Sequence, residues 1–452
     1  MMTNRRFALR SLAGAGLALP GLMSEMMAAP ADDPMAPKPP HFPAKTKRVI
    51  FLYMTGGVSH VDTFDPKPKL TADHGKTYRN KQFLVKSKFA FKRYGQSGLE
   101  VSELFPHVGE CADMLTVIRS MKNDDGDHFG ATLGIHAGQN NFSRPSIGSW
   151  VSYGLGTFNK NLPSFVVIAP HLPYGGGQIW GSDFLPAAHQ GMRVVPGGEP
   201  IPNMTRRAAT PELQRRELDL LAEFNRRHLR GRESDGNLAA RVRSLETAYG
   251  MQTEAPEVFD LSKETDATLK LYGLERGSTK GFAWQCLVAR RMAERGVRFI
   301  ELIDSGSDLN KNWDAHFDIM THVGMAKNVD QPIAALLRDL QSRGMLDDTL
   351  VVWTSEFGRT PFLAKADGIG REHHAPAFTS WMAGGGVKPG ITYGESDEYG
   401  ATVAKDMVHF HDFHATILHL LGIDHTRLTY RHAGRDFRLT DVHGVVVKGI
   451  LA

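Results

Sequence analysis

Carboxylate and imidazole side chains occur together where runs of apolar, β-forming residues end. The run 350–353 is followed by a glutamate and, later, by a histidine pair, and the run 297–303 by an aspartate and a histidine two residues apart. These candidate metal ligands are Glu356, His373, His374, Asp314 and His316. Imidazole nitrogens and carboxylate oxygens bind divalent metals and also transfer protons in catalysis. A strand-end glutamate with ordinary surface histidines is the alternative interpretation.

A second set of such residues follows the apolar run 48–54, which predicts the first strand. Its candidates are Ser59, His60 and Asp62, directly after two glycines that permit close approach of the backbone to a ligand. The glycines are not a P-loop, because no Gly-Lys-Ser/Thr follows them. An Asp-Pro turn with a solvated histidine is the alternative here.

His128 belongs to a third set, which follows the predicted strand 114–121. Its neighbours Asp124 and Asp125 are typical of an acidic turn that binds nothing. Near the C-terminus, Asp412 is predicted to cap a helix over 415–421. The histidines close to it are expected either to have structural roles or to support a ligand residue; they are His409, His411 and His414.

Predicted strands that alternate with helical patterns must position these residues. The strands are expected at 48–54, 114–121, 163–169, 297–303, 350–353 and 378–383. Such alternation indicates an α/β fold, and in open α/β sheets ligands bind beyond the carboxyl ends of the strands. We therefore expect the candidate residues to meet at that end of the sheet.

Composition narrows the class of protein. The chain has 452 residues with a formal net charge of +4, and no sustained Lys/Arg run supports nucleic-acid binding. Cys111 and Cys286 allow one disulfide or none. There are 20 histidines, which suits metal or proton chemistry without locating it.

The N-terminus reads as an export signal. Residues 1–29 contain a twin-arginine pattern (Arg5 and Arg6), an apolar stretch too short to span a membrane comfortably, and a small-residue cleavage site. This predicts export by the twin-arginine machinery to the periplasm or cell envelope, with no stable transmembrane segment. A Pro-rich linker is expected over 30–45, then one domain over 46–452 with a helical insertion at about 205–280.

Several motifs occur together in one order along the chain. They are 56–68 (GGVSHVDTFDPKP), 313–316 (WDAH), 355–361 (SEFGRTP), 370–374 (GREHH) and 434–439 (GRDFRL). With the twin-arginine start, they resemble the bacterial family called domain of unknown function 1501, which is placed with the sulfatase-like, alkaline-phosphatase-like superfamily. The resemblance covers nearly the whole chain after the signal.

The resemblance implies a three-layer sandwich, a mixed and mostly parallel sheet with helices on both faces. It also implies two divalent metal ions beside a Ser, Thr or Cys-derived nucleophile. Glu356 and His374 (or His373) stand where the superfamily has metal ligands, and Asp314 with His316 resembles its middle pair.

The sequence departs from the superfamily at two places. Glycines replace the acidic ligands after the first strand, so His60 and Asp62 would substitute for them. At the nucleophile position, His128 aligns in place of Ser, Thr or Cys. The nucleophile would then be Ser59 or Thr55, or a metal-activated water.

The implied activity is an exported, metal-dependent hydrolase of sulfate or phosphate esters, acting on a small molecule or polysaccharide. Its cofactor would be a divalent ion (Zn, Ca, Mg or Mn), with His128 as base or ligand. Arg359 or Arg371 would clamp the anionic group. The alternative is a binding or scaffold protein of the cell envelope that has kept the fold and lost turnover.

Overall fold

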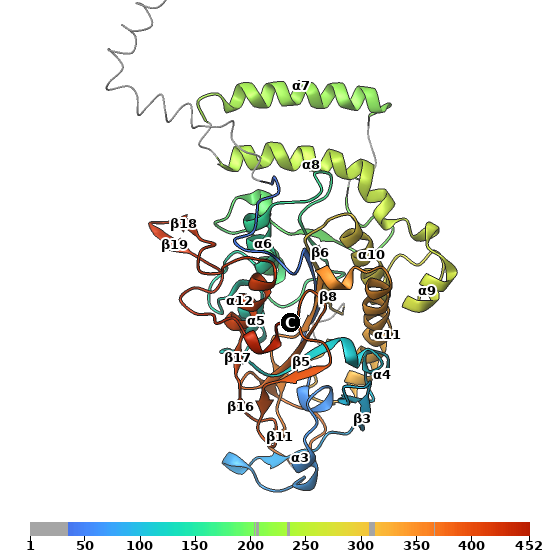
Figure 1. Ribbon diagram of the computed structural model, residues 1–452, viewed down its shortest axis with the longest axis vertical. Helices are drawn as coiled ribbons and strands as arrows, with labels where there is room; N and C mark the ends of the chain where they lie inside the picture. The colour runs from blue at the N-terminus through green and yellow to red at the C-terminus, as the bar shows by residue number, and fades with distance from the viewer. Residues whose placement is uncertain (1–34, 203, 205–207, 233–235, 307–311, 366) are drawn as a thin grey trace, which may run out of the picture.

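The computed structural model describes residues 35–202, 204, 208–232, 236–306, 312–365 and 367–452, which are drawn in colour in Figure 1. The predicted signal peptide, 1–29, lies outside the described residues. In the described part, the chain is built around a nine-stranded sheet. Eight of its strands follow one another in the order β14-β5-β13-β9-β1-β8-β6-β7, and the ninth, β17, also pairs with β5. Its strands are β1 (Arg48–Met54), β5 (Leu115–Lys122), β6 (Phe165–Ile168), β7 (Met192–Val194), β8 (Phe299–Asp304), β9 (Thr349–Thr354), β13 (Phe378–Ala383), β14 (Ile391–Tyr393) and β17 (Val408–His409).

The sheet is mixed and mostly parallel. Strand β1 pairs in parallel with β8 and β9, and β6 pairs in parallel with β7 and β8. Strand β13 alone runs against its neighbours β9 and β5, so β5 points the same way as β9 and β1. The chain therefore leaves β1, β5, β8 and β9 at the same end of the sheet.

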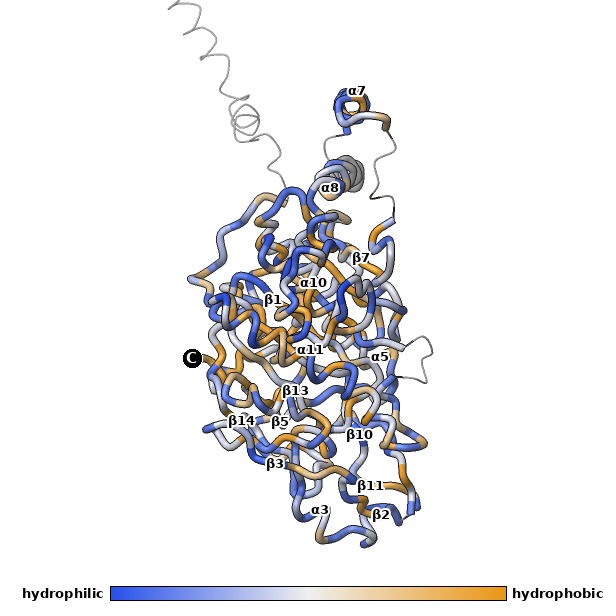
Figure 2. The backbone as a smooth tube through the Cα atoms, turned by 90° about the vertical axis from the view of Figure 1, so that its right-hand side faces the viewer, coloured by the Kyte–Doolittle hydropathy of each residue, from blue (hydrophilic) through white to orange (hydrophobic). Residues whose placement is uncertain are grey.

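Alternation of side chains along β1 shows that both faces of the sheet are covered. Ile50, Leu52 and Met54 belong to one hydrophobic core, whereas Phe51 and Tyr53 belong to another. Successive residues of a strand point to opposite faces, so a run that is apolar throughout requires a layer on each side. Figure 2 shows hydrophobic residues concentrated inside the body of the molecule.

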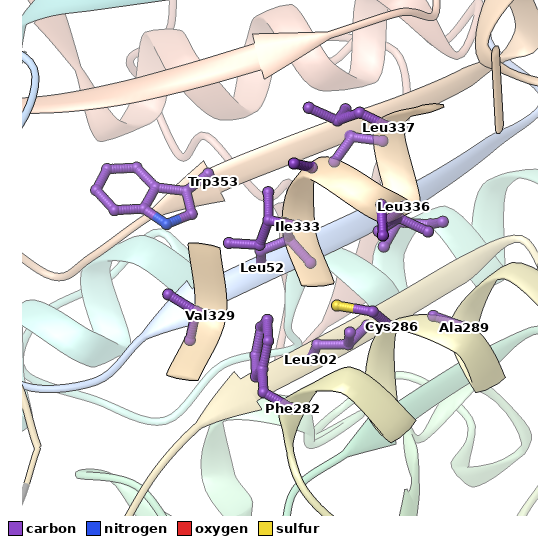
Figure 3. Close-up of a cluster of buried hydrophobic side chains, with 14 of the residues drawn as sticks. Leu52, Phe282, Cys286, Ala289, Leu302, Val329, Ile333, Leu336, Leu337 and Trp353 are labelled. Carbon is purple, nitrogen blue, oxygen red and sulfur yellow. The ribbon is translucent and has the colours of Figure 1, made fainter. Parts of the chain in front are cut away.

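Helices form the two outer layers, as Figure 1 shows. One layer contains α10 (Phe282–Glu294) and α11 (Thr321–Ser342); the other contains α5 (His128–Ala137), α6 (Ile147–Leu155) and α12 (Phe410–Leu420). In Figure 3, Leu52 and Leu302 of the sheet pack against Phe282 of α10 and Ile333 of α11. The predicted three-layer α/β sandwich is confirmed.

The segment predicted as an insertion contains α7 (Pro211–Leu229), α8 (Gly236–Phe259) and α9 (Asp266–Tyr272). Helices α7 and α8 lie side by side above the body in Figures 1 and 2. Cys111 and Cys286 are both buried and both free thiols, so they do not pair. Among the described residues, no helix combines the length and the apolar character needed to cross a membrane.

Candidate metal centre

Four side chains from separate parts of the chain meet beyond the carboxyl ends of the strands. They are His128, Asp314, His316 and His373, here called the His/Asp group, and one ligand atom from each lies within 4.8 Å of the others. The His316 Nε2 atom lies 2.8 Å from Nε2 of His373 and 3.1 Å from Oδ1 of Asp314. Nε2 of His128 lies 3.3 Å from Oδ2 of Asp314.

The strand ends explain why these residues meet. His128 begins α5, because Asp127 caps that helix by accepting a hydrogen bond from the N–H of Phe129. The loop with β10 (Gly358–Arg359), beyond β9, pairs antiparallel with β12 (His373–His374), which carries the third histidine. These segments follow strands that end at the same side of the sheet, where α/β proteins place their sites.

Asp314 and His316 reach the group because the segment after β8 folds against the end of β1. The N–H of Trp313 donates to the carbonyl of Thr55, and Gly56 lies against the backbone of Asp314. Gly56 has a φ of +114°, and a Cβ there would lie 2.7 Å from the Asp314 nitrogen. Only glycine allows this approach, which explains one of the two glycines noted in the sequence.

Each histidine of the group is fixed through its other ring nitrogen. Nδ1 of His128 donates to Glu356 Oε1 at 2.7 Å, and Nδ1 of His316 donates to Glu372 Oε2 at 2.6 Å. Nδ1 of His373 donates to the carbonyl of Gly126 at 2.7 Å. Carboxylates and carbonyls accept these bonds, so Nδ1 carries a proton and Nε2 is the ring atom that can bind a metal once it holds no proton of its own. Metal-binding histidines in proteins are held in this way.

The carboxylates of the site are ionised. Burial opposes the charge on Glu356, but hydrogen bonds from His128 and Tyr53 outweigh it and hold its pKa below the ordinary value. Burial also opposes the charge on Asp314, but His128, His373 and Arg359 hold its pKa well below the usual range. Burial lowers the pKa of His128, and the two carboxylates overcome this and raise it to about 8. Without a metal, the His128 ring is therefore protonated at neutral pH, and a metal ion would take the place of the proton on Nε2.

These residues fit a metal ion on three grounds. The first is geometric: the lone pairs of His316 and His373 face each other at 2.8 Å, which requires a cation or an added proton between them. Second, Nε2 of His128 is buried and lies 3.3 Å from Asp314 Oδ2, without a well-aligned hydrogen bond to any described residue. Third, three carboxylates (Asp314, Glu356 and Glu372) stand against the one guanidinium of Arg359. Once a metal has displaced the proton from Nε2 of His128, these groups leave a net charge of −2, which one divalent ion balances.

Four predicted ligands lie outside the group, namely His60, Asp62, Glu356 and His374. Glu356 contacts Nδ1 of His128, so it holds a member of the group in place and is not itself a member. His60 and His374 form a pair of their own. Both are buried, with rings stacked 5.8 Å apart, and their Nε2 atoms bond the carbonyls of Gly400 and Ala401. Burial lowers the pKa of both and brings that of His374 to about 3, so both rings are neutral. Neighbours on a strand face opposite ways, which explains why His373 and His374 separate.

Asp62, also predicted as a ligand, is paired inside the protein. Arg371 Nε donates to its Oδ2 at 2.6 Å, and the hydroxyl of Ser59 donates to the same atom. Asp62, Ser59 and Arg371 are all buried. The roles predicted for them (ligand, nucleophile and anion clamp) therefore do not fit their contacts.

Arg359, the other predicted anion clamp, belongs to the site in a different way. Its Nη2 atom lies 2.5 Å from Asp314 Oδ1, and its remaining contacts include the carbonyls of Gly56, Gly57 and Arg371. The side chain is fully buried. Arg359 thus orients the Asp314 carboxylate and is not directed at a ligand anion.

Three groups that complete the site are not evident from the sequence. Glu372 is adjacent to His373 in the motif 370–374, but its partner is His316, 56 residues earlier in the chain. Tyr174, in a glycine-rich loop, lies flat on the ring of His128, with centroids 4.0 Å apart and 3° between the planes. The carbonyl of Gly126 has no signal in the sequence.

Several solved structures resemble this chain at low similarity. A lipoteichoic acid synthase, LtaP, from Listeria monocytogenes is 9% identical, with 90% of this chain and 79% of that chain covered and a TM-score of 0.36. A protein in the alkaline phosphatase superfamily from Vibrio parahaemolyticus is 11% identical, with 86% and 70% covered and a TM-score of 0.37. Alkaline phosphatase from the Antarctic bacterium TAB5 is 13% identical, with 79% and 96% covered and a TM-score of 0.32. Their chemistry is not transferred to this chain.

Comparison at the level of sequence is more decisive. No curated protein matches the chain. A family model does match, over residues 46–451, and its description is protein of unknown function (DUF1501). This match spans almost the whole described part, including every residue of the His/Asp group. The chain belongs to the DUF1501 family.

Proposed function

We propose that this chain is an exported, metal-dependent hydrolase of sulfate or phosphate esters. The observation that carries the proposal is the convergence of three imidazole Nε2 atoms and one carboxylate within 4.8 Å, at the end of the sheet where α/β enzymes act. His128 and Asp314, whose pKa values are both shifted, lie in this group, and shifted pKa values cluster at functional sites.

The donor set favours Zn²⁺ or Mn²⁺ among the ions expected. Ca²⁺ and Mg²⁺ prefer oxygen ligands, whereas imidazole nitrogens suit transition metals. Three of the four donors of the His/Asp group are imidazole nitrogens. This set of donors suits a single ion, which His128, Asp314, His316 and His373 would hold.

A bound divalent ion would polarise the ester oxygens and lower the pKa of water, to about 7 in the favourable case of zinc. The chain's own residues prepare this chemistry. Glu356 fixes the tautomer of His128, and Arg359 fixes the Asp314 carboxylate. Ser59 is buried against Asp62, so water is the nucleophile in this proposal, and neither Arg359 nor Arg371 contacts the ester.

A binding or scaffold protein of the cell envelope is the second proposal. It is favoured by the contacts of Ser59 and Arg359, because both side chains are committed to the protein and not to a substrate. Such a protein would keep the metal and its ligands but turn over no ester.

Export remains part of the proposal, since the twin-arginine segment lies outside the described residues. Replacement of Arg5 and Arg6 by lysine should leave the protein in the cytoplasm, as measured by cell fractionation. Equal periplasmic levels of the variant and the parent protein would remove this part of the proposal.

The function is tested on protein purified from the periplasm. We expect about one transition-metal ion per chain by elemental analysis, and hydrolysis of 4-nitrophenyl sulfate or phosphate that a chelator removes and added metal restores. His373→Ala should lose metal and activity, whereas His374→Ala is the matched control, one residue away on the same strand. Metal without turnover of either ester favours the binding protein, and a metal-free, inert protein removes both proposals.

A further inference from the structure

Helix α7 has an apolar side that the rest of the described chain leaves uncovered. All 19 residues of the helix are described, and none of them is buried. Its large apolar side chains are exposed: 45% for Leu213, 57% for Leu220, 39% for Leu221 and 55% for Phe224. Their spacing brings them to one side of the helix. Because helices in water are stabilised mostly by the packing of such a side, this one indicates a missing partner.

Helix α8 covers a different side of α7. The half-buried residues of α7 recur at Gln214, Leu218, Asn225 and Leu229, and Nε2 of Gln214 donates to Oε1 of Gln252 in α8 at 2.5 Å. At 3.6 residues per turn, this side lies about a third of a turn away from the exposed one. In Figures 1 and 2, α7 lies beyond α8 and farther from the body of the molecule. The exposed side is therefore open to a second molecule.

The exposed side has the pattern of a seam between two helices. Leu213, Glu217, Leu220, Phe224 and Arg227 follow one another at alternating intervals of four and three residues. Two helices that pack along their length use this alternation. All five residues are exposed, so the seam carries apolar side chains together with one acidic and one basic residue.

The two charged residues of the seam lack full compensation within the chain. Arg226 and Arg227 both pair with Glu223, at 2.8 and 2.9 Å, so two guanidinium groups share one carboxylate. Glu217 forms no ion pair with any residue that the structure describes. The seam therefore offers a negative charge at Glu217 and a surplus positive charge at Arg227.

A membrane surface does not suit this seam. Glu217 lies between Leu213 and Leu220, so its carboxylate would enter the apolar layer together with them. Helices that lie in a membrane surface instead keep their charged residues on the opposite, polar side.

A second copy of α7 in the antiparallel direction matches the seam. With a two-fold axis beside Ala222, Leu220 packs against Phe224 of the second copy, and Glu217 faces Arg227 of the second copy. Two-fold symmetry repeats each of these contacts. A parallel pair would instead place Glu217 against Glu217 and Arg227 against Arg227. Charge complementarity thus selects the antiparallel pair.

We propose that the protein forms a two-fold symmetric dimer in which the two α7 helices pair antiparallel through this seam. The dimer goes beyond the proposed function and does not depend on it, because α7 contributes no residue to the His/Asp group.

Sedimentation velocity of the mature protein over a wide range of concentrations tests the dimer. We expect a reversible monomer–dimer equilibrium. Glu217→Arg and Arg227→Glu should each raise the dissociation constant about tenfold, because each change turns two opposite-charge contacts into like-charge contacts. The double variant Glu217→Arg/Arg227→Glu restores opposite charges in the reverse order and should dimerise as the parent protein does.

Arg226→Glu is the matched control. Arg226 pairs with the same Glu223 but lies off the seam, so its reversal should leave the dissociation constant unchanged. The side chains changed are all exposed, and circular dichroism checks that each variant folds.

Several results would overturn the dimer. They are a monomer at every concentration, a dimer that the two single reversals leave unchanged, and a loss that the double variant does not restore. An equal loss in Arg226→Glu would also overturn it. Flotation with vesicles of phosphatidylglycerol and phosphatidylcholine is the remaining arm, and a monomer that floats with them would assign the seam to a membrane. None of these readouts uses ester hydrolysis, so failure of the hydrolase and failure of the dimer are distinguished.

Discussion

Replacement of Glu356 by glutamine should weaken metal binding about 10–100-fold, which corresponds to roughly 1.4–2.7 kcal/mol. Glu356 is fully buried and accepts hydrogen bonds from Nδ1 of His128 at 2.7 Å, the N–H of Gly56 at 2.8 Å and the hydroxyl of Tyr53 at 2.9 Å. Glutamine keeps the shape of the side chain but removes its charge. The His128 ring then becomes a weaker ligand, because nothing ionised accepts its Nδ1 proton.

Glu372→Gln is the matched control for this experiment. Glu372 makes the same contact with His316, at 2.6 Å, but its side chain is 60% exposed. Water screens that charge, so its loss should change the affinity only a few-fold. Both variants are compared with the parent protein by competition for Zn²⁺ with a chromogenic chelator, after circular dichroism has shown that they fold. Unchanged affinity in Glu356→Gln, or an equal loss in both variants, would refute the reasoning.

Three further predictions concern other buried residues. His374→Ala should keep the full metal content by elemental analysis, and loss of the metal would show that the ligand set is wrong. Arg371→Ala leaves Asp62 buried without its cation and should lower the free energy of unfolding in urea by about 3–5 kcal/mol; a loss below about 1 kcal/mol would contradict this. Burial lowers the pKa of His189 and His414 to about 3 in the folded protein. As the pH falls below about 6.5, these histidines are protonated in the unfolded chain but stay neutral in the folded one, which favours unfolding. From pH 7 to pH 5, each histidine should therefore lower the free energy of unfolding of the chelator-treated protein by about 2 kcal/mol. An equal free energy of unfolding at both pH values would contradict this prediction.

Much of the architecture follows from the sequence because its strands are strongly apolar. The predicted strand at 48–54 is β1, and 378–383 is β13, with the same bounds. A strand that is apolar on both faces must be covered on both sides, and few folds other than a sheet between two layers of helices meet this requirement. The prediction that Asp412 caps α12 was wrong. The cap is His409, and Asp412 lies inside the first turn, where its carboxylate accepts the N–H of His409.

The site was harder to predict, since strand ends locate a region but not the direction of a side chain. His373 and His374 are neighbours in sequence, yet only His373 joins the His/Asp group. Asp62 pairs with Arg371 across 309 positions of the chain, and no local pattern reveals that contact. Residue types and strand ends therefore predict more metal ligands than the structure brings together.

X-ray absorption spectroscopy of the metal-loaded protein tests the central claim most directly, because it counts the nitrogen ligands of the ion without any assay of activity. The account predicts a signal from about three imidazoles, reduced to about two in His373→Ala and unchanged in His374→Ala. A metal coordinated by oxygen alone, or the same imidazole count in both variants, would contradict it.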